Sequence, residues 1–207
     1  METNRIYVYP LIIRIWHIIN ALNFVLLVVT GISLHFVAEG NNLIPFNVSV
    51  AVHNTCAIIL TLNYGLFIAG NIITGNGKYY RSWKTDLKKN MKPQIRFYLS
   101  GIFKKEKHPF PVNQDRKFNP LQKISYVMVM FVGMPLIIIT GLGLMFPSIM
   151  IADVFGISGM ALTDYAHYIV GFVLSMFLVI HIYTCTLGEK PGTLFKSIIN
   201  GYHEEHE

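Results

Sequence analysis

Four long apolar segments are the feature of this sequence that most constrains its fold. They cover about residues 11–36, 50–74, 123–146 and 164–187, and each has roughly the 20 mostly apolar residues that cross a bilayer. A segment inside a bilayer has no water to bond its backbone, so each is predicted to be an α-helix. The sequence therefore predicts an all-α membrane protein, a bundle of four transmembrane helices.

Composition agrees with this prediction. The 207 residues are 53% hydrophobic and only 14% charged, whereas soluble domains average about 25% charged residues. One membrane domain, 1–207, is expected, with a loop of about 75–122 between the second and third helices. The two cysteines, Cys56 and Cys185, form no C-x-x-C motif, which excludes a cysteine-ligated iron–sulfur cluster and the usual covalent attachment of c-type haem.

Basic residues are concentrated on one side of the predicted helices. Of the 17 lysine and arginine residues, 13 lie between residues 78 and 123, and the others flank the first helix or follow the last. The two remaining connections contain only acidic charges, Glu39, Asp153 and Asp164. By the positive-inside rule, both termini and the long loop are predicted to be cytoplasmic, in a multi-pass protein of the cytoplasmic membrane.

The long loop contains an apolar and aromatic stretch, PQIRFYLSGIF at 93–103, between basic residues. We expect a helix lying at the cytoplasmic interface, with packing against a partner subunit as the alternative. The lipid bilayer, through anionic headgroups, is one expected partner of this loop. No stretch resembles a nucleic-acid-binding motif, so no nucleic acid is expected.

Four histidines lie within the predicted helices at two depths. The first helix runs outward and the second returns, which places His17 near the inner surface and His53 near the outer surface. In the fourth helix His167 lies near the outer start and His181 near the inner end. These two are 14 residues apart, hence on one helix face and about 21 Å apart along the axis. Topology therefore pairs His53 with His167 and His17 with His181.

Two imidazoles that face each other in an apolar bundle suit the two axial positions of a haem iron. Two b-type haems held in this way, without covalent attachment, predict an electron path across the membrane. A lone intramembrane histidine is often only a helix–helix contact. A histidine-based metal transporter is a second alternative, but the helix interiors contain no Asp or Glu to complete a site for a divalent ion.

Small residues and one arginine accompany these histidines. Gly171 follows His167 by one helical turn, and Gly31 and Gly141 are further candidates for packing against haem, although close helix packing explains them equally well. Gly31 and Gly141 belong to two similar segments, VVTGISLHF and IITGLGLMF, compatible with an old duplication. Arg14 precedes His17 by three residues and is a candidate partner for a haem propionate or an interfacial anchor.

Three stretches and the histidine spacing together form a recognisable pattern: RIWHIINALNFVLLVVTG at 14–31, His53, SWKTDL at 82–87, KFNPLQK at 117–123, and His167 and His181. Over nearly its whole length the chain resembles the di-haem cytochrome b subunits that anchor periplasmic oxidoreductases. These include the gamma subunit of membrane-bound formate dehydrogenases and b-type cytochromes of thiosulfate reductases and nickel-iron hydrogenases, with a cytochrome b561-like bundle. The resemblance implies the same pairing, with His17 and His181 on the cytoplasmic-side haem and His53 and His167 on the outer-side haem.

The resemblance also implies a quinone site near the cytoplasmic-side haem. In the family an asparagine lines that pocket. Asn119 matches it, with Gln122 and Lys123 close by, and His181 is expected beside it. An alternative for Asn119 is a helix cap followed by an N1 proline, and the two roles are compatible.

These observations predict a subunit that moves electrons between menaquinone or ubiquinone near the cytoplasm and a periplasmic redox partner. The partner would be an iron–sulfur subunit or a multihaem cytochrome c, and no side chain of this chain is assigned a catalytic role. The alternatives are a free-standing cytochrome of the b561 type, which shuttles electrons or oxidises superoxide, and the metal transporter.

Overall fold

The structure is a computed structural model that describes residues 3–36, 44–81, 83–104, 106–111, 113, 116–149, 151–187 and 192–206. Within these ranges four helical stretches are long and apolar enough to cross a membrane. They are α1 (Leu11–His35), α2 (Phe46–Ile73), the stretch Pro120–Met145, and α8 (Gly159–Cys185). The predicted fold of four membrane-spanning helices is confirmed.

The third stretch is a single run of three helical pieces. It comprises α6 (Pro120–Met128), the π-helical turn η4 (Val129–Gly133) and α7 (Met134–Met145). Pro135 has no N–H to bond the carbonyl four residues earlier, and the wider π turn just before it accommodates that loss. The run begins at Pro120 rather than at 123, because Asn119 and Gln122 form a capping box ahead of it.

Two other spanning helices begin earlier than their hydropathy suggested, α2 at Phe46 and α8 at Gly159. The chain before α8 makes a tight hairpin of β2 (Asp153–Val154) and β3 (Ile157–Ser158). Its turn has positive φ angles at Phe155 (54°) and Gly156 (81°), as a two-residue hairpin requires. Because this hairpin ends at Ser158, helix α8 can begin at Gly159, ahead of the predicted start at 164.

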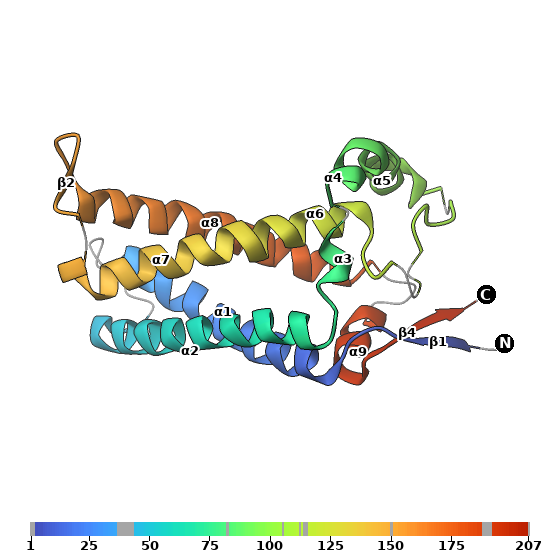
Figure 1. The fold of residues 1–207 in the computed structure, drawn as a ribbon, viewed down its shortest axis with the longest axis horizontal. Helices are drawn as coiled ribbons and strands as arrows, with labels where there is room; N and C mark the ends of the chain where they lie inside the picture. Colours follow the sequence, from blue (N-terminus) through green and yellow to red (C-terminus); the bar gives the residue numbers. More distant parts are fainter. Residues whose placement is uncertain are drawn as a thin grey trace. The chain divides into compact units, whose positions relative to one another are not determined.

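Contacts divide the chain into two compact units, which are described separately. The bundle unit contains Ile15–Ile68 and Gly133–Tyr183, and the loop unit contains Met1–Arg14, Ala69–Val132 and Thr184–Glu207. In the bundle unit, parts of α1, α2, α7 and α8 run alongside one another (Figure 1). Its buried apolar side chains include Trp16, Phe67 and Leu174. Large apolar side chains such as Leu62 (72% exposed) cover its outside, which suits hydrocarbon rather than water as the surrounding solvent.

The loop unit brings the two ends of the described chain together. Strand β1 (Thr3–Tyr7) pairs antiparallel with β4 (Tyr202–His206), and helix α9 (Thr193–Asn200) precedes β4. These short strands add to the helices that the sequence predicts. Their pairing places the two ends of the described chain side by side.

The long loop folds into short helical pieces: α3 (Lys78–Arg81), α4 (Trp83–Thr85), η2 (Asp86–Asn90), α5 (Met91–Arg96) and η3 (Phe97–Gly101). The helix predicted at 93–103 is therefore present over most of its length. Its apolar side chains Leu99 and Phe103 are 75% and 82% exposed. This pattern suits the interfacial position that the sequence predicts.

Candidate functional site

The bundle unit brings together the same two histidine pairs that the topology predicts. The ring centroids of His17 and His181 are 6.2 Å apart, and those of His53 and His167 are 6.3 Å apart. Helix α8 supplies one histidine of each pair, whereas α1 supplies His17 and α2 supplies His53. Each pair therefore joins two different helices.

The spacing within each pair fits a shared metal. A metal–imidazole bond is about 2 Å long and a ring nitrogen lies about 1.1 Å from its ring centroid, so two imidazoles on opposite sides of one metal have centroids about 6 Å apart. A direct hydrogen bond between two ring nitrogens, at about 3 Å, requires closer rings. Both gaps therefore fit the two axial ligands of a b-type haem iron.

A threonine contacts each histidine of the outer pair. Thr30 Oγ1 lies 2.9 Å from His53 Nδ1, and Thr140 Oγ1 lies 3.0 Å from His167 Nδ1. No role was predicted for either threonine from the sequence. Both occupy the same place in the similar segments VVTGISLHF and IITGLGLMF, and that repetition was the available signal.

The glycine after each threonine faces the same imidazole. A Cβ atom built on Gly31 would lie 3.5 Å from His53 Cε1, and one on Gly141 would lie 3.2 Å from His167 Cε1. These two glycines therefore let a helix backbone approach the ring closely. A Cβ on Gly171 would instead meet the Ile137 side chain at 3.7 Å, which fits the alternative of helix packing, and a haem-packing role for Gly171 stays a prediction.

Aromatic side chains contact the inner pair, and one amide side chain bonds the backbone next to it. The Phe177 ring stacks on His181 at 5.7 Å with an interplanar angle of 15°. Trp16 precedes His17, and Asn63 Nδ2 donates to the Trp16 carbonyl at 3.1 Å. Among the described residues, Trp16 Nε1, Asn20 Oδ1 and Asn63 Oδ1 are buried without a hydrogen-bond partner. The indole N–H can donate to a carboxylate such as a haem propionate, and the amide oxygens can accept from water.

Arg14 lies in the loop unit. Its Nε donates to the Ile198 carbonyl at 3.4 Å, which ties the start of α1 to α9. The chain turns directly after α9 at Gly201, whose φ of +89° suits glycine. A role for Arg14 beside a haem propionate remains a prediction.

Asn119 and Gln122 cap the start of α6. Asn119 Oδ1 accepts from the backbone N–H of Gln122 at 2.9 Å, and Gln122 Oε1 accepts from the backbone N–H of Asn119 at 3.2 Å. Asn119 Nδ2 also donates to the Tyr98 hydroxyl at 3.0 Å. The capping role is confirmed, and the quinone role remains a prediction. These residues lie in the loop unit, whereas His181 lies in the bundle unit.

Lys123 forms a buried ion pair with Asp86. Lys123 Nζ lies 2.6 Å from Asp86 Oδ2, and Asn90 Nδ2 donates to Asp86 Oδ1 at 2.7 Å. Burial raises the pKa of Asp86, but the hydrogen bonds from Lys123 and Asn90 outweigh it, so the pKa is lowered overall. Asp86, which lies in the SWKTDL stretch, therefore fixes the long loop to the start of α6.

A second buried lysine has an amide partner. Lys117 Nζ donates to Asn76 Oδ1 at 2.6 Å, and Asn76 Nδ2 donates to Asn71 Oδ1 at 2.7 Å. Burial, with a smaller contribution from Lys78, lowers the pKa of Lys117 to about 8. Gln94 is fully buried, and neither of its amide atoms has a partner in the described part of the chain. The loop unit therefore contains a lysine whose pKa is lowered toward neutrality and a buried amide that can hydrogen-bond to a further group.

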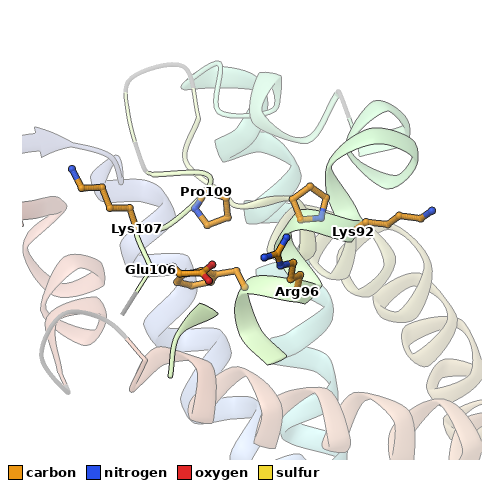
Figure 2. Close-up of a pocket in the computed structure, with 7 residues that line it drawn as sticks. Lys92, Arg96, Glu106, Lys107 and Pro109 are labelled. Carbon is orange, nitrogen blue, oxygen red and sulfur yellow. The ribbon is translucent and has the colours of Figure 1, made fainter. Parts of the chain in front are cut away.

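The loop unit also has an open depression of about 560 Å³. Its lining residues are Lys92, Pro93, Arg96, Phe97, Glu106, Lys107 and Pro109. Figure 2 shows Arg96 and Glu106 in its middle, with Lys92 and Lys107 reaching outward. None of the predicted site residues lines it, so it plays no part in the candidate site.

Comparisons with known proteins agree with this geometry. Residues 8–201 match the family model described as prokaryotic cytochrome b561. The chain is 38% identical over 200 residues to the Escherichia coli (strain K12) protein named "Putative cytochrome YdhU", a match that covers 96% of this chain and 75% of that protein. No solved structure matches the chain. With its four spanning helices, this chain belongs to the prokaryotic cytochrome b561 family and is a membrane-bound, haem-binding b-type cytochrome of electron transfer.

Proposed function

We propose that this chain is a di-haem membrane subunit that passes electrons between a quinone site at the cytoplasmic face and a redox partner outside. The observation that carries the proposal is the pair of facing histidine couples, with centroids 6.2 Å and 6.3 Å apart. A single b-type haem uses only two axial ligands, so two couples support two haems.

The bundle unit supports a path through the membrane rather than one isolated site. When bound, each haem would supply one-electron transfer at its iron. His167 and His181 lie 14 residues apart on α8, so the helix holds the two couples about 21 Å apart in depth.

The loop unit supports quinone chemistry at the basic side. Reduction of a quinone to a quinol takes two electrons and two protons, so the site needs hydrogen-bond partners at the carbonyls and a proton source. We assign Asn119, Gln122 and Lys123 to this site, with either menaquinone or ubiquinone as substrate. Lys117, with a pKa of about 8, and the unpartnered amide of Gln94 support such a site.

The distribution of charge supports the orientation. The basic loop would face the cytoplasm, together with both termini. The His53–His167 couple would then face outward, where a periplasmic iron–sulfur subunit or multihaem cytochrome c would exchange electrons with it. The potential of that partner would set the direction of electron flow.

Electron transfer through sealed proteoliposomes tests the proposal. Ferricyanide is enclosed in vesicles that contain the haem-loaded protein, and dithionite is added outside. We expect ferricyanide to be reduced faster than in protein-free vesicles, and expect His53→Ala to remove that gain. Ferricyanide reduction that is no faster in vesicles with the wild-type protein than in protein-free vesicles would contradict a transmembrane path.

The family description favours one second candidate, a free-standing b561-type cytochrome. Purification from native membranes in mild detergent separates the two. A stable complex with an iron–sulfur or cytochrome c subunit supports the anchor role. A haem-loaded protein that is always isolated alone supports the free-standing cytochrome.

A further inference from the structure

We infer that Thr30 and Thr140 are positioning residues that set the tautomer of the outer histidines and tune the potential of the haem they hold. The inference rests on the proposed function for the haem itself. It concerns one hydroxyl on each side of the outer couple, and both hydroxyls have the same arrangement of partners.

The hydroxyl hydrogen of each threonine is committed to the helix backbone. Thr30 Oγ1 donates to the Leu26 carbonyl at 2.7 Å, and Thr140 Oγ1 donates to the Leu136 carbonyl at 2.7 Å. A carbonyl oxygen only accepts, and a hydroxyl has one hydrogen to give. At the histidine, therefore, each threonine oxygen can only accept.

The imidazole must supply the other hydrogen. His53 Nδ1 lies 2.9 Å from Thr30 Oγ1, and His167 Nδ1 lies 3.0 Å from Thr140 Oγ1. Both rings thus carry their hydrogen on Nδ1, which leaves the lone pair of Nε2 for a metal. The backbones of Leu27 and Ile137 also hydrogen-bond to these two rings. Inside a helix their N–H groups are already used, so their carbonyls accept as well.

The glycine after each threonine completes the arrangement. Gly31 and Gly141 present no side chain where a Cβ would lie 3.5 Å and 3.2 Å from the two Cε1 atoms. The Thr-Gly step therefore places an acceptor at Nδ1 and leaves room for the ring beside it. The inner histidines instead have the aromatic neighbours Trp16 and Phe177.

A hydrogen bond accepted from Nδ1–H makes the opposite nitrogen more basic, and such partners typically contribute 10- to 100-fold to metal affinity. A more basic ligand favours ferric over ferrous iron. The threonines should therefore lower the potential of the outer haem and leave the inner haem unchanged.

The test uses haem-loaded Thr30→Val and Thr140→Val, redox titration of both haems, and the low-spin ferric EPR signals. The His53→Ala variant, which retains the inner haem, assigns the signals. We expect the outer potential to rise, its EPR signal to shift and its haem to be bound roughly 10- to 100-fold more weakly. Thr→Ser at each position should restore the wild-type values, because serine keeps the hydroxyl.

Thr61→Val is the matched control. Thr61 makes the same backbone hydrogen bond, to the Ala57 carbonyl at 2.8 Å, and none of the four histidines is among its hydrogen-bond partners in the described chain. It should leave both haems unchanged.

The outcomes separate this inference from the proposed function. A higher potential and weaker binding of the outer haem in the valine variants, with recovery in the serine variants, supports the inference. Two haems with potentials and EPR signals unmoved by valine overturn it, as does an equal loss in valine and serine. Wild-type protein that binds fewer than two haems overturns the proposed function itself.

Discussion

A buried ion pair in the loop unit and the histidine couples in the bundle unit are arranged in different ways. In the loop unit Lys123 pairs directly with Asp86, and Asn119 donates to Tyr98. In the bundle unit the histidines face each other across a gap too wide for a hydrogen bond. Direct pairs stabilise the fold, whereas facing groups without a direct contact fit a ligand between them.

Removing one outer histidine should have the largest effect. His167→Ala leaves His53 without its opposite ligand, so the outer haem should be lost and the haem content halved. His181→Ala should remove the inner haem in the same way. Haem content and reduced spectra of the two purified variants measure this. Retention of both haems in either variant would show that the couples are not ligand pairs.

Breaking the buried ion pair of the loop unit should affect stability instead. Asp86→Asn removes the carboxylate from Lys123 and should cost roughly 3–5 kcal/mol, seen as a lower unfolding temperature in detergent with both haems still bound.

The pH dependence of the protein's stability in acid should also report the Asp86–Lys123 ion pair. The folded pKa of Asp86 is lowered, so the unfolded state takes up its proton first, near pH 4. The stabilisation is complete above that pH and is lost as the pH falls through the folded pKa. Asp86→Asn should remove this acid-dependent loss. An unchanged acid profile in the variant would mean that the pair contributes little.

An added methyl group should distinguish the glycines of the bundle unit. Gly141→Ala places a Cβ at 3.2 Å from His167 Cε1, tighter than the 3.5 Å at Gly31. We expect overpacking of about 1–3 kcal/mol at Gly141 and a smaller effect at Gly31, both seen in the EPR signal of the outer haem. Gly171→Ala, which would meet Ile137, is the control. A stronger effect at Gly171 than at Gly141 would reverse this assignment.

Two substitutions at Asn119 should separate its cap from a quinone role. Asn119→Ala removes both functions and should cost about 1 kcal/mol of cap energy, whereas Asn119→Ser keeps a capping oxygen and removes the amide. If the amide binds quinone, both variants should slow quinol oxidation several-fold with unchanged haem spectra. A serine variant with wild-type turnover would leave Asn119 with the cap alone.

The four helices and the pairing of the histidines were predictable because hydropathy and topology act over whole segments. Alternating helix direction determines depth, and depth was enough to place His17 with His181 and His53 with His167. The helix start at Asn119–Pro120 was also predictable, since its capping pattern is local.

The remaining features depend on contacts between distant residues. The pairing of β1 with β4 joins strands nearly the whole chain apart, and short polar strands give little periodic signal. The contact between Asp86 and Lys123 depends on how the long loop folds over α6. Thr30 and Thr140 stand out in sequence only by their shared place in two similar segments, and their contact with the histidines is shown by the distances.

Haem stoichiometry tests the central claim most directly. The protein is purified after expression with sufficient haem, and its b-type haem is measured per chain by the pyridine haemochrome method. Two histidine couples predict about two haems per chain, because each haem uses two axial ligands. One haem or none in well-folded, fully loaded protein would contradict the claim that both couples are haem sites.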